Sequence, residues 1–112
     1  MEIIRCLEES DIVNDFKVLA FETFESGFFL KIKANLINEI ELFIREYSDI
    51  NERDYSYHLQ DKNKKLIMRW DNATRHKQIE TFPHHLHHGK HIFPSFEISC
   101  DEILKVIEKK IL

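Results

Sequence analysis

A two-residue alternation over residues 30–36, which resumes after residue 39, is the feature that most constrains the fold. From Leu30 to Leu36, apolar side chains occupy every second position and the residues between them are polar. Alternate side chains of an extended strand point to opposite faces, so this pattern predicts a β-strand with one buried face. The alternation resumes from Ile40 to Tyr47 after the break Asn38-Glu39, which predicts a second strand reached through a tight turn.

An apolar run, Phe16 to Phe24, precedes these strands and is joined to them by Glu25-Ser26-Gly27. A short connection that contains glycine is typical of a β-hairpin, so we predict a hairpin here. A helix over residues 10–24 is the alternative, because apolar residues in that range also fall at helical spacing.

Two further strands are predicted at Tyr55–Gln60 and Lys65–Asp71, on either side of the turn Asp61–Lys64. A four-residue loop predicts a register in which each large apolar side chain meets an apolar partner: Gln60 opposite Lys65, Leu59 opposite Leu66, Tyr57 opposite Met68, and Tyr55 opposite Trp70. We therefore expect the two tyrosines and the tryptophan in the core. The other face receives Ser56, His58, Gln60, Ile67, Arg69 and Asp71, with His58 as a diagonal neighbour of Arg69.

The C-terminal segment has the pattern of a helix that packs on a sheet. Ser99, followed three residues later by Glu102, predicts a capping box, and the apolar residues after it mark one helical face: Ile103, Leu104, Val106, Ile107 and Ile111. Pro94 is expected to keep Ile92–Ile98 at a sheet edge or in an extended loop. The predicted fold class is α+β: one domain over residues 1–112, with a mainly antiparallel meander sheet of about five strands and the C-terminal helix packed on one face.

Composition limits the classes of function. The formal net charge of −4 argues against binding nucleic acid through bulk positive charge, so a phosphate-binding surface must be local. Charged residues between Met1 and Ser10 interrupt any signal-peptide run, and no stretch reaches transmembrane length. Cys6 and Cys100 match no metal or redox spacing and are predicted to be free thiols, so we expect a cytoplasmic protein.

Histidines gather between Phe82 and His91, where five of the seven in the chain lie. Imidazole transfers protons near neutral pH and is also a common metal ligand, so the cluster indicates a chemical site. One interpretation is a zinc site built from His84, His85, His87, His88 and His91. In this interpretation, two pairs have the i, i+4 spacing of a helical face, His84 with His88 and His87 with His91, while His85 and His87 would share a face in a strand.

Three sequence blocks resemble the TumE family of toxins from toxin-antitoxin modules: Tyr-Ser-Tyr-His-Leu-Gln-Asp at 55–61, Arg-Trp-Asp-Asn-Ala at 69–73, and Phe-Pro-His-His-Leu-His-His-Gly at 82–89. The matching positions are Tyr57, His58, Gln60, Asp61, Arg69, Trp70, Asp71, Asn72, His76, Phe82, Pro83, His84, His85, His87 and Gly89. Thr74 and Arg75 stand where Pro and His are expected, and His88 and His91 lie outside the pattern. The resemblance implies a small intracellular prokaryotic toxin that acts on RNA and is neutralised by a helix-turn-helix antitoxin encoded by a neighbouring gene.

Cleavage of RNA by its own 2′-hydroxyl needs a base, an acid and positive charge on the phosphate. The candidate catalytic residues are His84, His85, His87, His58, Arg69 and Asp71. His84 or His85 is the first choice for base or acid, Arg69 would hold the phosphate, and Asp71 would orient a histidine. The expected substrate contacts are Arg69, Gln60, Arg75, Lys77 and Asn72, with positive potential around Arg69, Arg75, Lys77 and Lys90.

The leading hypothesis is therefore a metal-independent endoribonuclease without a cofactor. Two other classes stay open: a zinc-binding protein that uses the histidine cluster, and a non-catalytic module whose histidine loop docks the antitoxin. Cleavage that survives chelation would eliminate a metal mechanism, and growth arrest relieved by the partner would favour catalysis over docking. The number of copies in the assembly also stays open, with a homodimer as one option.

Overall fold

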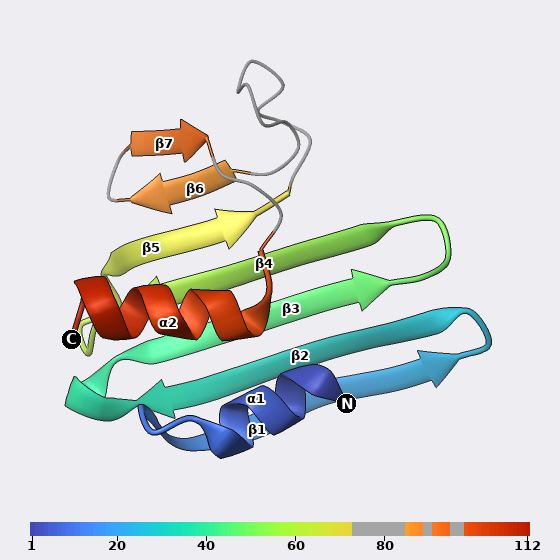
Figure 1. Ribbon diagram of the computed structural model, residues 1–112, viewed down its shortest axis with the longest axis horizontal. Helices are drawn as coiled ribbons and strands as arrows, with labels where there is room; N and C mark the ends of the chain where they lie inside the picture. Colours follow the sequence, from blue (N-terminus) through green and yellow to red (C-terminus); the bar gives the residue numbers. More distant parts are fainter. Residues whose placement is uncertain (73–84, 89–90, 95–97) are drawn as a thin grey trace.

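Figure 1 shows the computed structural model of the chain, which describes residues 1–72, 85–88, 91–94 and 98–112. Within these residues the elements are α1 (Glu2–Glu9), β1 (Val13–Phe24), β2 (Gly27–Leu36), the 3₁₀ turn η1 (Ile37–Glu39), β3 (Glu41–Ser48), β4 (Arg53–Gln60), β5 (Leu66–Asp71), β6 (His85–His88), β7 (His91–Pro94) and α2 (Cys100–Lys110). No helix among the described residues is long and apolar enough to cross a membrane.

The strands form one antiparallel sheet in which each strand lies beside its neighbour in sequence, in the order β1-β2-β3-β4-β5-β6-β7 (Figure 1). This confirms the predicted α+β class and the meander order. The described residues contain seven strands rather than about five, because the histidine-rich segment adds β6 and β7. Pro94 ends β7 at the edge of the sheet, a position where its missing N–H costs no ladder hydrogen bond.

The first hairpin is confirmed, and the alternative helix over residues 10–24 is wrong. β1 pairs with β2 from Val13 opposite Leu36 to Phe24 opposite Gly27. The register of β1 shifts between Val13 and Asp15 and again near Leu19. Such bulges break the two-residue period, which explains why the apolar residues of this strand also fit a helical spacing.

The tight turn predicted at Asn38-Glu39 is also present. Both residues have a positive φ, 64° and 61°, and the amide of Leu36 donates to the carbonyl of Ile40 across the turn. Asparagine tolerates this left-handed conformation better than glutamate does. The turn therefore places a strained Glu39 in the short connection from β2 to β3.

The predicted register of the second hairpin is wrong by two residues. In the structure Tyr57 pairs with Trp70 and His58 with Arg69, whereas Gln60 pairs with Leu66 across a register shift. The Asp61 carboxylate accepts hydrogen bonds from the amides of Asn63 and Lys65, which closes a loop one residue longer than predicted. The register shift beside Gln60 accounts for the second residue of the displacement, because Ile67 of β5 lies between the two paired positions Leu66 and Met68.

A displacement of two residues leaves the side chains of β4 and of Met68–Asp71 on their predicted faces, because the side-chain period of a strand is two. The register shift beside the turn instead sets Leu66, predicted to face the core, opposite Gln60, while Ile67, predicted on the open face, packs against the core. The predicted core is accordingly confirmed: Tyr55, Tyr57, Leu59, Met68 and Trp70 are all buried. His58 changes from a diagonal neighbour of Arg69 to its direct partner across the ladder.

Both helices contribute to one core on the same face of the sheet. In α2 the Ser99 hydroxyl accepts from the amide of Glu102, and the Glu102 carboxylate accepts from the amide of Ser99, so the predicted capping box is confirmed. α1 was not predicted; it buries Ile3 and Leu7, one helical turn apart. The core joins Ile3, Leu7, Ile103, Leu104 and Ile107 of the helices to the inward side chains of β2–β5. The helices leave the opposite face of the sheet uncovered.

Candidate functional site

A row of candidate functional side chains crosses the face of the sheet that the helices leave open. The register sets Phe43 of β3 opposite His58 of β4, His58 opposite Arg69 of β5, and Arg69 opposite His87 of β6. Residues directly opposite one another on neighbouring strands project to the same face. The sheet therefore brings a guanidinium between two imidazoles that lie far apart in the sequence.

Asp71 lies in the neighbouring cross-strand row, close to both Arg69 and His87. Its side chain is only 2% exposed, and its Oδ2 accepts a hydrogen bond from Arg69 Nε at 3.0 Å. His87 Nε2 lies 3.2 Å from the same oxygen, with its side chain 13% exposed. A buried carboxylate is tolerated when cations or donors surround it, so the hydrogen bond from Arg69 stabilises Asp71, and His87 adds to this when its ring is protonated. Asp71 thus lies close to a histidine, and its predicted orienting role stays a prediction.

His58 is held from both sides of its ring. Nε2 lies 3.1 Å from Gln60 Oε1, and Gln60 in turn donates through Nε2 to Glu41 Oε1 at 3.1 Å. Nδ1 lies 3.4 Å from Arg69 Nη1, a group that only donates. We infer the neutral tautomer with the proton on Nε2, because Gln60 Oε1 can only accept and Arg69 can only donate. The lone pair of Nδ1 then faces the guanidinium.

Burial lowers the pKa of His58 from its ordinary value of 6.5, and the nearby positive charge of Arg69 lowers it further, while the hydrogen bond to Gln60 opposes the shift. Neutral imidazole is the form that accepts a proton. His58 is therefore poised as a base at neutral pH.

The pKa of His58 should accordingly lie below 6.5 when it is measured by NMR titration of its ring protons, assigned with a His58→Gln variant. Because the folded state disfavours the imidazolium, His58 should reduce the stability of the fold as the pH falls below 6.5. Arg69→Gln removes the repelling charge and should move the pKa upward towards 6.5. A pKa above 6.5 in the unmodified chain, or a downward shift in Arg69→Gln, would contradict the described geometry.

A hollow of about 290 Å³ opens beside His58 on this face. It is lined by Leu19, Lys31, Ile32, Phe43, Ile44, Arg45, Ser56, His58, Gln60 and Arg69. Of these, His58, Gln60 and Arg69 were predicted as site residues. Lys31, Phe43 and Arg45 were not, although the alternation that predicted β2 and β3 already placed them on the polar face.

The remaining sequence-predicted residues differ in what the structure describes of them. Asn72 is used within the fold: its side chain bonds the backbone of β4 at Arg53 and Tyr55. Several predicted residues lie outside the described residues: His84, Arg75, Lys77, His76 and Lys90. The cationic cluster expected around Arg69, Arg75, Lys77 and Lys90 is described only at Arg69.

The metal-binding interpretation can be compared with the backbone alone. His85–His88 and His91–Pro94 form strands, so the helical i, i+4 pairing of His87 with His91 is wrong. His88 instead stands directly opposite His91, and His85 stands opposite Asp71. Among the side chains that the structure describes, no group of three or more histidine, cysteine or acidic residues could hold a metal ion.

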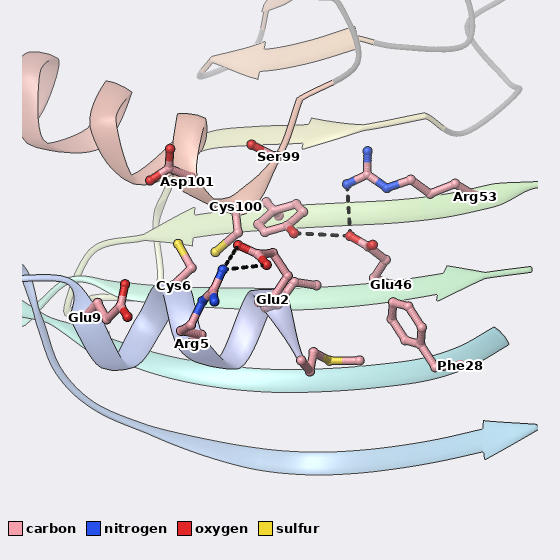
Figure 2. A pocket seen from close by; sticks show the side chains of 13 residues that line it. Glu2, Arg5, Cys6, Glu9, Phe28, Glu46, Arg53, Ser99, Cys100 and Asp101 are labelled. Atoms are coloured by element: carbon pink, nitrogen blue, oxygen red, sulfur yellow. Dashed lines mark hydrogen bonds and ion pairs between the residues drawn. The ribbon is translucent and has the colours of Figure 1, made fainter.

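A second cavity, of about 780 Å³, lies on the helix-covered face between α1 and the start of α2 (Figure 2). The Glu46 carboxylate inside it accepts from Arg53 Nη2 at 2.9 Å and from the Tyr57 hydroxyl at 3.2 Å. Cys6 and Cys100 also line it, and both thiols are free, as predicted. Burial raises the pKa of both thiols, which opposes a reactive thiolate.

The fold and the open-face cluster define a small α+β protein with an imidazole–guanidinium–carboxylate site on a meander sheet. The family described as Toxin TumE matches residues 3–111, so the chain belongs to the TumE toxin family. It is accordingly a toxin of a toxin-antitoxin module, and it has an antitoxin partner. No curated protein and no solved structure matches the chain.

Proposed function

We propose that this toxin is a metal-independent endoribonuclease that cleaves RNA through the 2′-hydroxyl. The observation that carries the proposal is the position of Arg69 between His58 and His87 in one cross-strand row. Two imidazoles supply the base and the acid that the reaction needs, and the guanidinium between them supplies positive charge where negative charge develops.

In the proposed reaction, His58 acts as the base through Nδ1, whose lone pair becomes available when the bound phosphate takes over the hydrogen bond of Arg69 Nη1. It takes the proton of the 2′-hydroxyl, whose oxygen then forms a bond to the adjacent phosphorus. The lowered pKa of His58 keeps Nδ1 unprotonated at neutral pH. The fixed contact with Gln60 leaves Nδ1 as the ring nitrogen that faces Arg69. Gln60, predicted as a substrate contact, thus acts here as a positioning residue for the base.

Arg69 is proposed to bind the phosphate that is attacked. Its Nε is engaged with Asp71, while Nη1 faces His58, so the outer edge of the guanidinium is directed towards the base. The side chain is 33% exposed, which leaves it accessible from the hollow. Planar guanidinium donors match the oxygens of a phosphate and strengthen as its charge grows.

The proton for the departing 5′-oxygen is proposed to come from His87. The Asp71 carboxylate, 3.2 Å from His87 Nε2, stabilises the protonated imidazole that acts as a donor. The bond from phosphorus to the 5′-oxygen breaks as this proton is transferred, which leaves a 2′,3′-cyclic phosphate and a free 5′-hydroxyl. His85, opposite Asp71 in the ladder, and His84 are the alternative donors proposed from the sequence.

Incubation of the purified chain with single-stranded RNA, with and without a chelator, tests the chemistry. We expect fragments with a 2′,3′-cyclic phosphate and a 5′-hydroxyl in both conditions, and none with RNA that carries 2′-O-methyl groups. A His58→Ala, His87→Ala double variant is the control for a contaminating nuclease. Activity that chelation abolishes and zinc restores would favour the metal interpretation instead, and 5′-phosphate ends would refute attack by the 2′-hydroxyl.

A growth assay tests the same proposal in the cell. We expect expression of the chain alone to arrest growth, and co-expression of its antitoxin, proposed to be a helix-turn-helix protein, to relieve the arrest. The double variant should leave growth unchanged while it still binds the antitoxin. Arrest by the double variant at equal abundance would instead indicate a toxin that acts by binding.

A further inference from the structure

The open face of the sheet continues past His58 into a band of cationic side chains on β1–β3. Two adjacent cross-strand rows form this band. One row sets Lys17 opposite Lys33 and Lys33 opposite Phe43, and the next sets Lys31 opposite Arg45. Neighbouring strands lie about 5 Å apart, so these residues form a continuous surface that leads to Arg69.

Cationic and acidic side chains occupy different cross-strand rows of this face. Within β1–β3, each ionisable residue of the two central rows is a cation, and the acids stand in the flanking rows: Asp15 and Glu41 on one side, Glu22 on the other. Lys33 pairs with Glu41 at 2.9 Å and Arg45 with Asp54 at 3.5 Å, but both cations are 40% or more exposed. Exposed pairs of this kind are weak, so a phosphate can compete for the cations. A chain with a net charge of −4 thus presents a local anion-binding band.

Two aromatic side chains are set into the same face. Phe43 and Phe29 lie on the open side of the sheet and are only partly buried. A cation accompanies each ring: Lys33 Nζ lies 5.9 Å from the centroid of Phe43, and the Arg45 guanidinium lies 5.3 Å from that of Phe29. Phe43 also meets the His58 ring edge to face at 6.3 Å. Neither ring joins the core under the helices, so packing of the core does not account for them.

We propose that this basic aromatic face, defined by Phe29, Lys31, Lys33, Phe43 and Arg45, binds single-stranded RNA and delivers it to His58 and Arg69. The inference rests on the proposed function, because RNA is the substrate of the adjacent site. Phe43 lines the hollow with His58 and Arg69, so a base stacked on Phe43 stands next to the phosphate on Arg69. Lys31 and Arg45 bind the backbone on the side of the hollow away from β5.

The chemistry of the face selects unpaired bases. Aromatic rings bind nucleic acid by stacking on the flat faces of bases, and these faces are covered by neighbouring pairs in a duplex. Stacking tolerates any base, whereas cations recognise the common phosphate, so the preference is for strandedness rather than for sequence.

Binding of a fluorescent, 2′-O-methyl single strand of about 12 nucleotides, followed by anisotropy, tests the face without cleavage. Phe43→Ala should weaken binding about 5- to 100-fold, and Phe43→Tyr should retain it, because tyrosine keeps the stacking surface. Phe21→Ala is the matched control: Phe21 is exposed but pairs with Leu30 on the helix-covered face, so binding should stay unchanged. Thermal melting verifies that each variant is folded.

Ionic strength supplies a second readout. A Lys31→Ala, Arg45→Ala variant should show a shallower dependence of affinity on salt concentration, by about one to two released counterions. A duplex of the same strand should bind more weakly than the single strand. Equal affinities of Phe43→Ala and Phe21→Ala, or an unchanged salt dependence in the lysine–arginine variant, would overturn the proposal.

The same experiment keeps the two proposals separate. If the methylated strand binds through Phe43 but unmethylated RNA is never cleaved, the binding face stands and the ribonuclease proposal fails. If RNA is cleaved normally by Phe43→Ala and the methylated strand binds equally to all variants, the catalytic proposal stands and the binding face is refuted.

Discussion

Replacing Arg69 by alanine is expected to reduce the rate of RNA cleavage about 100- to 1000-fold at saturating RNA. The guanidinium is the one cation in direct contact with both the proposed base and the buried Asp71 among the described residues. Its loss removes the donors that stabilise charge on the phosphate. The measurement is a single-turnover cleavage rate, with circular dichroism to verify the fold.

Arg69→Lys separates the phosphate role from the structural one. Lysine keeps a positive charge near Asp71 but lacks the planar fork, so the thermal stability should stay near that of the parent chain while cleavage stays at least about tenfold slower. Arg69→Ala should lose both thermal stability and cleavage, since Asp71 is 2% exposed and loses the hydrogen bond from Nε. Arg5→Ala, an exposed arginine of α1 on the other face, is the control and should cleave normally. Full cleavage activity in Arg69→Lys would show that a positive charge alone is enough, and would contradict the proposed role of the planar guanidinium.

The faces of the strands could be predicted from the sequence because burial on one side imposes a period of two. Lys31 and Lys33 between buried Leu30, Ile32 and Ala34 leave no other assignment. The cross-strand partner of each residue was predicted less accurately than its face. The register of β4 and β5 depends on how Asp61 closes the loop and on a local shift beside Gln60, and neither feature has a periodic signal.

α1 was missed for a different reason. Ile3, Ile4 and Leu7 have helical spacing, but the segment is short and rich in charge, and its stability depends on packing against α2 and β1. A helix of this length is marginal on its own, so the sequence pattern is weak until the core is known.

The candidate site was predicted in its components but not in its arrangement. The resemblance identified His58, Arg69, Asp71 and His87, and alternation placed the first three on one face. The contact between His87 and Asp71 depends on β6 pairing with β5 across residues 73–84, a relation between segments that spacing does not encode. Lys31, Phe43 and Arg45, which carry the proposed RNA-binding face, lie on β2 and β3 outside the three sequence blocks that resemble the family.

In the proposed mechanism the open face carries the catalytic residues and the helix-covered face carries the core, and Glu46 tests whether the two faces act independently. Glu46→Leu is expected to lower the free energy of unfolding by about 3 kcal/mol. The Glu46 side chain is 9% exposed, pairs with Arg53 (Figure 2) and accepts a hydrogen bond from the Tyr57 hydroxyl. Its removal leaves Arg53 partly buried beside the Tyr55 ring without this carboxylate. Equilibrium denaturation measures the change.

Arg53→Met alone should cost a similar amount, because it leaves the Glu46 carboxylate without that cation. The double variant, Glu46→Leu with Arg53→Met, should recover most of the loss, since well-packed apolar groups replace a buried ion pair at little cost. Additive losses would instead show that the two residues are stabilised independently. When the double variant is folded, it should cleave RNA at the parent rate, because Glu46 and Arg53 lie on the face opposite to His58 and Arg69. A folded variant that has lost cleavage would show that the two faces are coupled through the sheet.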